Sequence, residues 1–331
     1  LVPRTDYESN PFYGFNELPS FISPFSDEFL EEIIFLKSFV INYLNQKLNL
    51  NKRESHWVYN GLEIFLLNKY INDFYPKVKF LGRLAGISLL KNYEISKINF
   101  NDLFLNYSEY VQRLNLHQID DQSSEYLTRI NEEIASPYHS GLGLIYIEEI
   151  IGEKNFKDLV RSVNTLRTRE ELNNLFINYS NVDLTWFVQD YIGKRQSIDL
   201  KIKRINKNEI EVYEKNNILI PYSVGFLKND SIIETRFFEE YKRIELPKLD
   251  YDYVAINPDI TIPESNRNNN WIYTKSNSNL KPLKVKFIGD LENPKFKTLY
   301  LRPEITYNLY DGISPGFNIF IAILSVLIAD R

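Results

Sequence analysis

The spacing of apolar residues changes near residue 197, and this change constrains the fold more than any other feature of the sequence. Up to residue 192, apolar residues recur mostly at helical spacing, as in residues 30–48 and 137–151. From residue 197, the stretch "SIDLKIKRI" alternates apolar and charged residues. Because helices repeat every 3.6 residues and strands every two, the first part is predicted to be helical and the second to form strands.

The helical part has recognisable start and stop signals. Ser26 is a good N-cap, and Asp27 and Glu28 follow it at the positive end of the helix dipole. A polar connection over residues 49–55 then precedes a second helix, predicted from residue 56 or 57 to about 71. Further helices are predicted over residues 137–151, 156–164, 168–179 and 183–192. Gly152 is placed to end the first of these as a C-cap glycine.

The second part of the chain predicts several short strands. Between residues 197 and 256, alternating segments are separated by Asn, Asp or Pro, which is typical of a small antiparallel sandwich. Residues 258–280 resemble an irregular linker, and "LKVKFI" and "KTLYLRPEITYNLY" again predict strands. The last apolar run, residues 317–330, is too short to cross a bilayer as a helix. It is either a buried element or a contact with a membrane or a missing partner domain.

We therefore expect an α+β multidomain chain: a mostly helical lobe, a small antiparallel β-sandwich and a β-rich C-terminal tail. The predicted boundaries are an extended N-terminal segment at 1–25, the helical domain at 26–195 and the sandwich at 196–262. The last predicted region, 263–331, contains a linker and C-terminal β segments. If a β-barrel follows in the chain, this region would lie next to its start. A chain of 331 residues, 44% of them hydrophobic, is long enough for such cores.

Composition narrows the possible functions. The sequence has no cysteine, so thiol nucleophiles, thiolate metal sites and disulfides are excluded. Its three histidines are His56, His117 and His139, and none belongs to an HExxH pattern. The net charge is −5, and the basic residues are scattered, so no nucleic-acid partner is expected.

Three segments, in order along the chain, resemble the catalytic domain of the gluzincin aminopeptidases, the group of alanyl aminopeptidase and leukotriene hydrolase. "HWVYNGLEIFLLNKY" (56–70) is similar to the W-L-N-E-G helix of that family. "PYHSGLGLIYIEEIIG" (137–152) is similar to its P-Y-x-K-G segment, and "LTWFVQDYI" (184–192) to the end of its domain. The resemblance implies that the helical domain is a thermolysin-like peptidase lobe.

In that family, zinc is bound by the histidines of HExxH and by a glutamate eighteen residues later. Aligning the W-L-N-E-G motif on residues 57–61 puts Lys37 and Ile41 at the histidine positions, Ser38 at the general base and Asn60 at the glutamate. A lysine ammonium repels a dication, isoleucine has no lone pair, asparagine is a weak neutral ligand, and serine cannot act as the base. The resemblance thus implies a catalytically degenerate member that lacks zinc, other cofactors and catalytic residues.

Part of the family's cleft is retained. Tyr138 falls on the catalytic tyrosine, whose hydroxyl stabilises an oxyanion in active members, although without metal a packing role is the alternative. The candidates for the cleft are Trp57, Tyr59, Glu63, Tyr138 and His139, and Trp57 can also be interpreted as a core anchor. His56 and His139 could meet in space, but two histidines make a poor metal site. Lys37 either extends to the surface or pairs with a buried acid such as Glu63.

"KPLKVKFIGDLENPK" and "YNLYDGISPGF" also look like segments of large bacterial envelope proteins, in which a degenerate peptidase lobe precedes an outer-membrane-type barrel. This resemblance implies a location in the periplasm or at the outer membrane of a Gram-negative bacterium. Three functions stay open. The chain is a non-catalytic module that binds or scaffolds an unidentified peptide or protein, an active zinc-dependent aminopeptidase whose metal ligands lie outside this sequence, or a structural part of an outer-membrane barrel protein.

Overall fold

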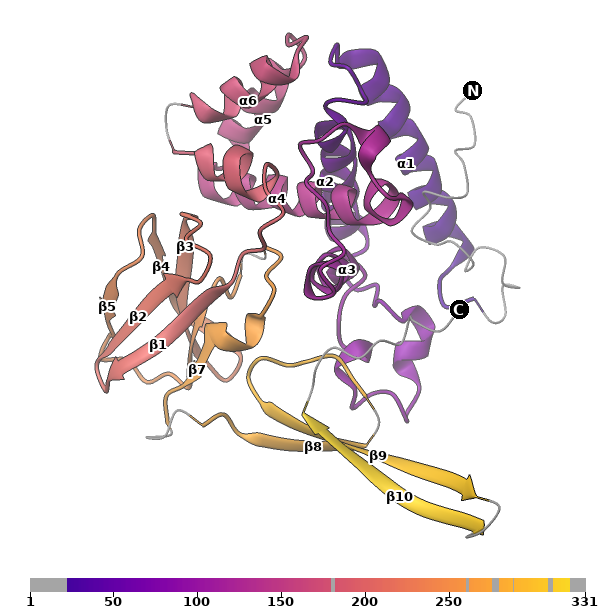
Figure 1. Ribbon diagram of the computed structural model, residues 1–331, viewed down its shortest axis with the longest axis vertical. Helices are drawn as coiled ribbons and strands as arrows, with labels where there is room; N and C mark the ends of the chain where they lie inside the picture. The colour runs from indigo at the N-terminus through magenta and orange to yellow at the C-terminus, as the bar shows by residue number, and fades with distance from the viewer. Residues whose placement is uncertain are drawn as a thin grey trace.

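The computed structural model describes residues 23–179, 182–259, 262–275, 280–287, 289–308 and 312–321. Helices occupy the chain to about residue 192, and strands occupy most of the rest (Figure 1). The protein is therefore a mixture of α and β structure, as the change of spacing near residue 197 predicted. Most of the predicted N-terminal segment, and the apolar run beyond residue 321, lie outside the described residues.

The helical part is built from helices joined by short turns. The helices are α1 (Asp27–Lys47), α2 (His56–Phe74), α3 (Asp102–Arg113), α4 (Ser136–Ile151), α5 (Glu153–Val163) and α6 (Arg169–Ile177). The shorter turns are η2 (Gly82–Gly86), η3 (Glu94–Ser96), η4 (Ser124–Tyr126), η5 (Asn131–Ala135) and η6 (Phe187–Tyr191). Helix α1 begins as predicted, because the Ser26 hydroxyl accepts a hydrogen bond from the Phe29 N–H at 3.4 Å. The helix predicted over 183–192 is a short turn with π-helical hydrogen bonding.

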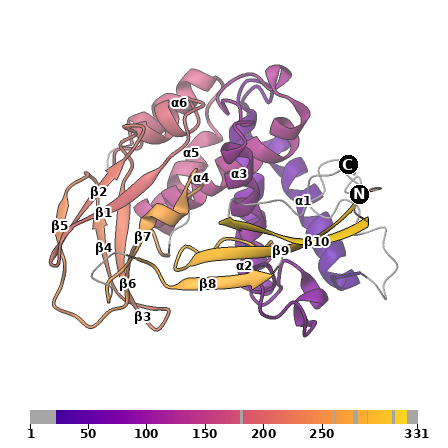
Figure 2. The same cartoon turned by 60° about the horizontal axis from the view of Figure 1, so that its bottom comes forward.

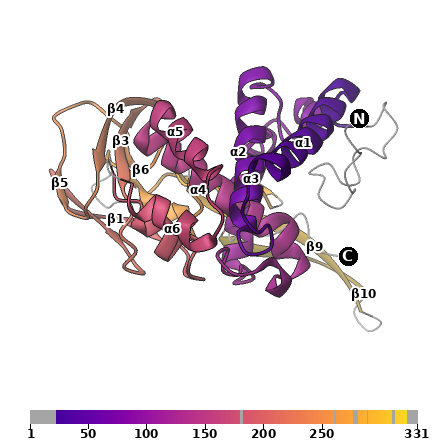
Figure 3. The same ribbon diagram turned by 90° about the horizontal axis from the view of Figure 1, so that it is seen from above.

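Helices α2 and α4 pack closely against each other (Figure 3). At Gly141 of α4, an added Cβ would lie 2.6 Å from Ile64 of α2, which is closer than any side chain could tolerate. The glycine thus lets the two helix backbones approach. Since α2 and α4 both contribute residues to the candidate site, this contact fixes the relative position of two of its walls.

Two antiparallel sheets follow the helices. One contains β1 (Leu200–Asn206), β2 (Glu209–Glu214) and β5 (Arg243–Glu245), in the order β1-β2-β5. The other contains β3 (Tyr222–Lys228), β4 (Ser231–Phe238), β6 (Tyr253–Ile256) and β7 (Trp271–Tyr273), in the order β4-β3-β6-β7. Buried residues of both sheets belong to one hydrophobic core, among them Val212 and Val224.

The interpretation of residues 258–280 as a linker is wrong in part. Strand β7 lies within this stretch and extends the second sheet by pairing with β6. A short helix, η7 (Arg267–Asn270), precedes β7 directly. The strand is three residues long and follows a run of asparagines, so alternation could not reveal it. The boundary predicted at residue 262 therefore falls inside the region that completes this sheet.

Tyr146 of α4 connects the helical part to the sheets. Its side chain is fully buried, and its hydroxyl donates a hydrogen bond to the carbonyl oxygen of Pro221 at 2.5 Å. The ring also packs edge-on against Trp186 in the same core. One side chain therefore makes an apolar contact within the helical part and a polar contact with the residue before β3.

Replacing Tyr146 with phenylalanine is expected to lower the free energy of unfolding by about 1–3 kcal/mol, because the Pro221 carbonyl would lose a buried donor while the ring contacts remain. Urea denaturation followed by circular dichroism measures the change. Tyr126→Phe is the matched control, since that side chain is 70% exposed, and it should leave the transition unchanged. Equal effects in both variants would contradict the role of the Tyr146 hydroxyl.

A third sheet ends the described chain. It contains β8 (Leu283–Phe287), β9 (Lys297–Asn308) and β10 (Gly312–Ile321), in the order β10-β9-β8. Strands β9 and β10 form an antiparallel hairpin that extends away from the other sheets, while β8 runs parallel to β9 (Figures 1 and 2). The Asp290 carboxylate joins this sheet to the helical part by accepting hydrogen bonds from the backbone N–H groups of Glu94 and Ile95. Among the described residues, no helix has the length and apolar character needed to span a membrane.

Candidate functional site

A cleft of about 630 Å³ opens between α1, α2 and the segment that leads into α4. This volume is within the range of pockets that hold small ligands or a short stretch of peptide. Its walls are formed by Lys37, Ile41, Leu44, Asn45, Lys52, Arg53, His56, Tyr59, Asn60, Glu63, Ile64, Ser124, Glu132, Glu133, Pro137 and Tyr138.

The positions that the resemblance assigns to zinc ligands line this one cleft. Lys37 and Ile41 lie one helical turn apart on α1, and Asn60 faces them from α2. Ser38, at the position of the general base, is buried, and it is not among the residues that line the cleft. Folding thus brings Asn60 to the same cleft as Lys37 and Ile41, although it belongs to a separate helix.

Lys37 and Glu63 form an ion pair in the wall of the cleft. The Lys37 Nζ lies 3.5 Å from the Glu63 Oε1, and each side chain is only 10% exposed. Burial raises the pKa of the Glu63 carboxyl above its ordinary value, and the neighbouring Lys37 ammonium partly reverses that shift. Lys37 therefore pairs with a buried acid in the structure, and the alternative that it extends to the surface is not found.

These residues do not fit a zinc ion. An ammonium group, an aliphatic side chain and a neutral amide occupy the three ligand positions, and the ammonium is already engaged by Glu63. Elsewhere in the part of the chain that the structure describes, no group of three or more His, Asp or Glu could hold a metal ion. A reaction that requires a metal-activated water therefore has no support from the donor atoms of this cleft.

Tyr138 lies in the cleft wall at the start of α4. Its ring packs edge-on against Phe104, with 4.9 Å between ring centroids, and against Tyr107. Burial raises the pKa of its hydroxyl far above the ordinary value, so the phenol stays protonated at physiological pH. The side chain can donate a hydrogen bond to a bound group, and its aromatic contacts hold it in place.

Tyr59 and His56 join α2 to the loops around the cleft. The Tyr59 hydroxyl donates to the carbonyl oxygen of Leu50 at 2.9 Å, which ties down the connection after α1. The His56 Nε2 lies 2.9 Å from the carbonyl oxygen of Gln122. Burial lowers the pKa of the His56 imidazole, so its neutral form is favoured at pH 7.

Two of the sequence-predicted cleft residues lie elsewhere. Trp57 is fully buried and packs edge-on between Phe176 and Phe187 in the core. His139 faces a different, much smaller pocket and hydrogen-bonds to Asp120. Their assignment to the cleft is wrong, because helix periodicity turns both side chains away from the face that Asn60 and Tyr138 present.

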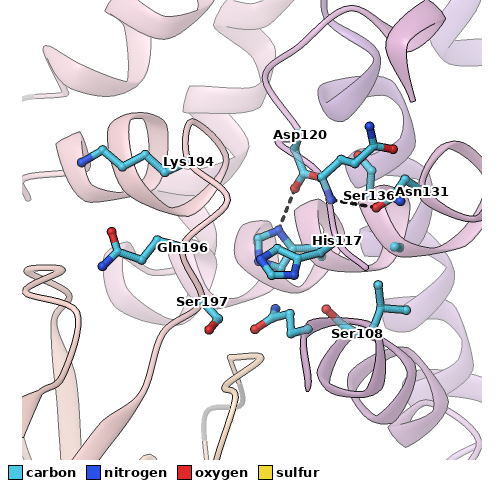
Figure 4. Close-up of a pocket in the computed structure, with 13 residues that line it drawn as sticks. Ser108, His117, Asp120, Asn131, Ser136, Lys194, Gln196 and Ser197 are labelled. Carbon is cyan, nitrogen blue, oxygen red and sulfur yellow. Dashed lines mark hydrogen bonds and ion pairs between the residues drawn. The ribbon is translucent and has the colours of Figure 1, made fainter. Parts of the chain in front are cut away.

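The second pocket is about 10 Å³, room for roughly a single water (Figure 4). In it, the His139 Nδ1 lies 2.7 Å from an Asp120 carboxylate oxygen, and the ring stacks on Tyr191. Such a histidine and carboxylate could orient a nucleophile. The Ser136 hydroxyl in the same wall, however, has no hydrogen-bond partner among the described residues. His56 and His139, two histidines that the sequence already indicated to be a poor metal site, line different pockets.

Sequence reasoning missed the charged residues around the mouth of the cleft. Lys52 and Arg53 approach from the connection between α1 and α2, while Glu132 and Glu133 approach from the π-helical turn η5. The Arg129 Nε lies 2.9 Å from the Glu133 Oε1, so these two side chains form an ion pair. Nothing in the local spacing of these residues pointed to the cleft, because their positions depend on how the loops fold over α2.

No protein-family model matches this sequence, and no curated protein matches it. The resemblance to the gluzincin aminopeptidases therefore rests on the three motifs and on the positions counted from them.

Proposed function

We propose that this chain is a non-catalytic, peptidase-derived binding module of the Gram-negative cell envelope, in the periplasm or at the outer membrane. Its cleft holds an extended stretch of peptide or protein without hydrolysing it. The observation that carries the proposal is the Lys37–Glu63 ion pair, which lies among the ligand positions that the resemblance assigns, in a cleft that stays open.

The lining of the cleft suits a peptide backbone. Asn45 and Asn60 each offer an amide that can donate and accept, which is the complement of a peptide group. Ile41, Leu44 and Ile64 provide apolar surface for side chains. Basic residues at one part of the mouth and acidic residues at another would give a bound segment a preferred direction.

The same proposal extends to the architecture. The order of a helical region, two antiparallel sheets and a third sheet agrees with a thermolysin-like lobe followed by smaller β-domains. The three motif segments lie on α2, on α4 and at the π-helical turn η6. In an active enzyme of this type, these elements would surround the metal; in this chain we propose that they form only the binding surface.

Measuring zinc and hydrolysis tests the alternative of an active aminopeptidase. Protein purified without chelator is expected to contain far less than one zinc per molecule by atomic emission, and to leave aminoacyl-anilides intact with or without added zinc. Stoichiometric zinc, or hydrolysis that a chelator abolishes, would overturn the non-catalytic proposal.

Peptide binding is tested with an array of random decapeptides, followed by anisotropy titrations of the tightest binders. Asn60→Trp places an indole in the cleft and is expected to weaken these peptides at least tenfold, about 1.4 kcal/mol of binding free energy. The matched control is Asn72→Trp, which makes the same change on an exposed part of α2 and should leave the affinity within twofold. Thermal melts of both variants check that the fold is intact. If no decapeptide binds, or if Asn60→Trp binds as well as wild type, the cleft is not the binding site.

A further inference from the structure

The sheet formed by β8, β9 and β10 separates apolar from polar positions. Because successive residues of a strand alternate between faces, and paired residues share a face, the register assigns each position to one side. Among the side chains that the structure describes, one face contains Leu283, Val285 and Phe287 of β8, Leu299, Leu301, Pro303, Ile305 and Tyr307 of β9, and Ile313 and Ile319 of β10. The charged residue on that face, Lys297, is the first residue of β9.

The opposite face is mostly polar and is attached to the body of the protein near its base. Thr298 and Tyr300 are buried there, and the Tyr300 hydroxyl donates to the carbonyl oxygen of Asp290 at 3.2 Å. Lys286, on the same face, forms ion pairs with Asp290 and Glu94. These contacts fix the polar face toward the protein and turn the apolar face outward.

The apolar face is open to solvent in the isolated chain. Seven of its side chains are between 52% and 76% exposed, namely Leu283, Val285, Phe287, Ile305, Tyr307, Ile313 and Ile319, whereas Leu299 and Leu301 are half-buried. A continuous apolar surface on this scale marks a contact with a partner or a membrane, because water-exposed apolar area in a soluble protein is usually scattered.

The pattern favours lipid hydrocarbon over a protein surface as the occupant. A protein partner is usually met by an apolar centre within a polar rim, whereas this face contains no charged or amide side chain from Leu299 to Tyr307. Strands β9 and β10 have 12 and 10 residues, which matches the roughly 9–11 residues of a tilted strand across the hydrocarbon core. Lys297 and Tyr307 lie near opposite ends of β9, where a bilayer presents its polar interfaces.

Backbone pairing agrees with the same occupant. Every residue of β10 has a registered partner on β9, so the two strands are paired along the whole of β10, although Pro303 and Pro315 have no N–H to donate. The outer edge of β10 pairs with no other described strand. Inside hydrocarbon, a strand from a neighbouring segment or molecule has to cover that edge.

We infer that the apolar face of the β8–β9–β10 sheet contacts the hydrocarbon of a lipid bilayer, with the β9–β10 hairpin as the inserted element. This inference does not depend on what the cleft binds. Its failure would leave the proposed peptide binding untouched, since the two surfaces share no residue.

The test is co-sedimentation of the full chain with vesicles of pure phosphatidylcholine, which are uncharged overall and so exclude a purely electrostatic attraction. Wild-type protein is expected to partition into the vesicle pellet. Ile305→Lys places a charge in the middle of the apolar face and is expected to lower the partition coefficient at least tenfold. Ser314→Lys adds the same charge on the polar face of the neighbouring strand, at an exposed position, and should change it less than twofold.

A second measurement covers the case in which Ile305→Lys fails to fold. Relative to wild type, Ile305→Trp is expected to add tryptophan fluorescence that is blue-shifted when these vesicles are present. Lipids brominated on their acyl chains are expected to quench this added fluorescence. Protein that stays in the supernatant, or added emission that brominated lipid does not quench, would overturn the inference. So would a lipid-independent dimer that Ile305→Lys separates, because the occupant would then be a second copy of the chain.

Discussion

Replacing Lys37 with methionine is expected to lower the free energy of unfolding by about 3 kcal/mol at neutral pH. The substitution leaves the buried Glu63 carboxylate without its cation, and breaking a buried pair from one side typically costs about 3–5 kcal/mol. We expect the lower end of this range because both side chains keep about a tenth of their surface in contact with the cleft. Differential scanning calorimetry or urea denaturation measures the loss.

The loss should depend on pH in a defined direction. Glu63 already has a pKa above its ordinary value of 4.5, and removal of Lys37 raises it further. A carboxyl group whose pKa is higher in the folded state than in the unfolded state binds its proton more tightly when the protein is folded. Its contribution to the free energy of unfolding therefore becomes less favourable as the pH rises from the unfolded-state pKa through the folded-state pKa. The stability deficit of Lys37→Met is therefore expected to be larger at pH 8 than at pH 5, where Glu63 is closer to being protonated in both states.

Two further variants separate the ion pair from other effects. Lys37→Met combined with Glu63→Leu removes both charges and should regain most of the lost stability. Lys47→Met, on the exposed last turn of the same helix, should change stability by less than about 1 kcal/mol. A deficit that is the same at both pH values, or that the double variant does not reduce, would show that the pair does not act as described.

Replacing Trp57 with alanine is expected to destabilise the protein by about 3–5 kcal/mol, the usual effect of removing a large aromatic side chain from a core. Trp57 is fully buried, with its ring centroid 5.7 Å from that of Phe176 and 5.5 Å from that of Phe187. The cavity that remains is bounded by aromatic rings on two helical segments, which cannot easily move together to fill it.

The matched variant is Trp57→Phe, which keeps an aromatic ring in place and should lose less than half as much stability. Urea denaturation gives both values. Peptide affinity, measured below the unfolding transition, should be unchanged in Trp57→Phe because the residue does not line the cleft. A loss below about 1 kcal/mol in Trp57→Ala, or a selective loss of peptide binding in Trp57→Phe, would contradict a purely structural role.

Apolar spacing predicted five of the six α-helices in the described residues, but it did not predict α3, and the helix predicted over 183–192 is a π-helical turn. Ser26, Thr168 and Gly152 mark helix ends by side-chain capping or by a positive φ angle, and the structure contains a helix boundary at each. Strands β1 and β2 follow alternation, which a single sequence displays directly, whereas β3 is buried on both faces and could be predicted only from its apolar run and the turn residues around it. The π-helical turns and the three-residue strand β7 could not be predicted, because they are too short to display a period of their own.

In the candidate site too, positions on helices could be predicted from the sequence and positions on loops could not. Residues on one helix face could be placed from spacing, as for Lys37 with Ile41, and Asn60 with Glu63. The opposite wall could not, since Glu132 and Lys52 reach the cleft through loops whose course depends on tertiary packing. For the same reason Trp57 and His139 were assigned to the wrong surface: they lie close in sequence to cleft residues, but their side chains leave the helices in other directions.

The pairing of Lys37 with Glu63 also determines how readily a metal centre could evolve in this cleft. Introducing the HExxH pattern requires changes at residues 37, 38 and 41, and the glutamate ligand requires a change at residue 60; the first histidine would displace the cation that Glu63 needs. A lineage that began with that step would carry a less stable protein before it gained any affinity for metal. If residue 63 changed first, the buried Lys37 ammonium would be left unpaired instead. Substitutions at residues 37 and 63 are therefore expected to be strongly epistatic, because either change alone leaves a buried charge unpaired.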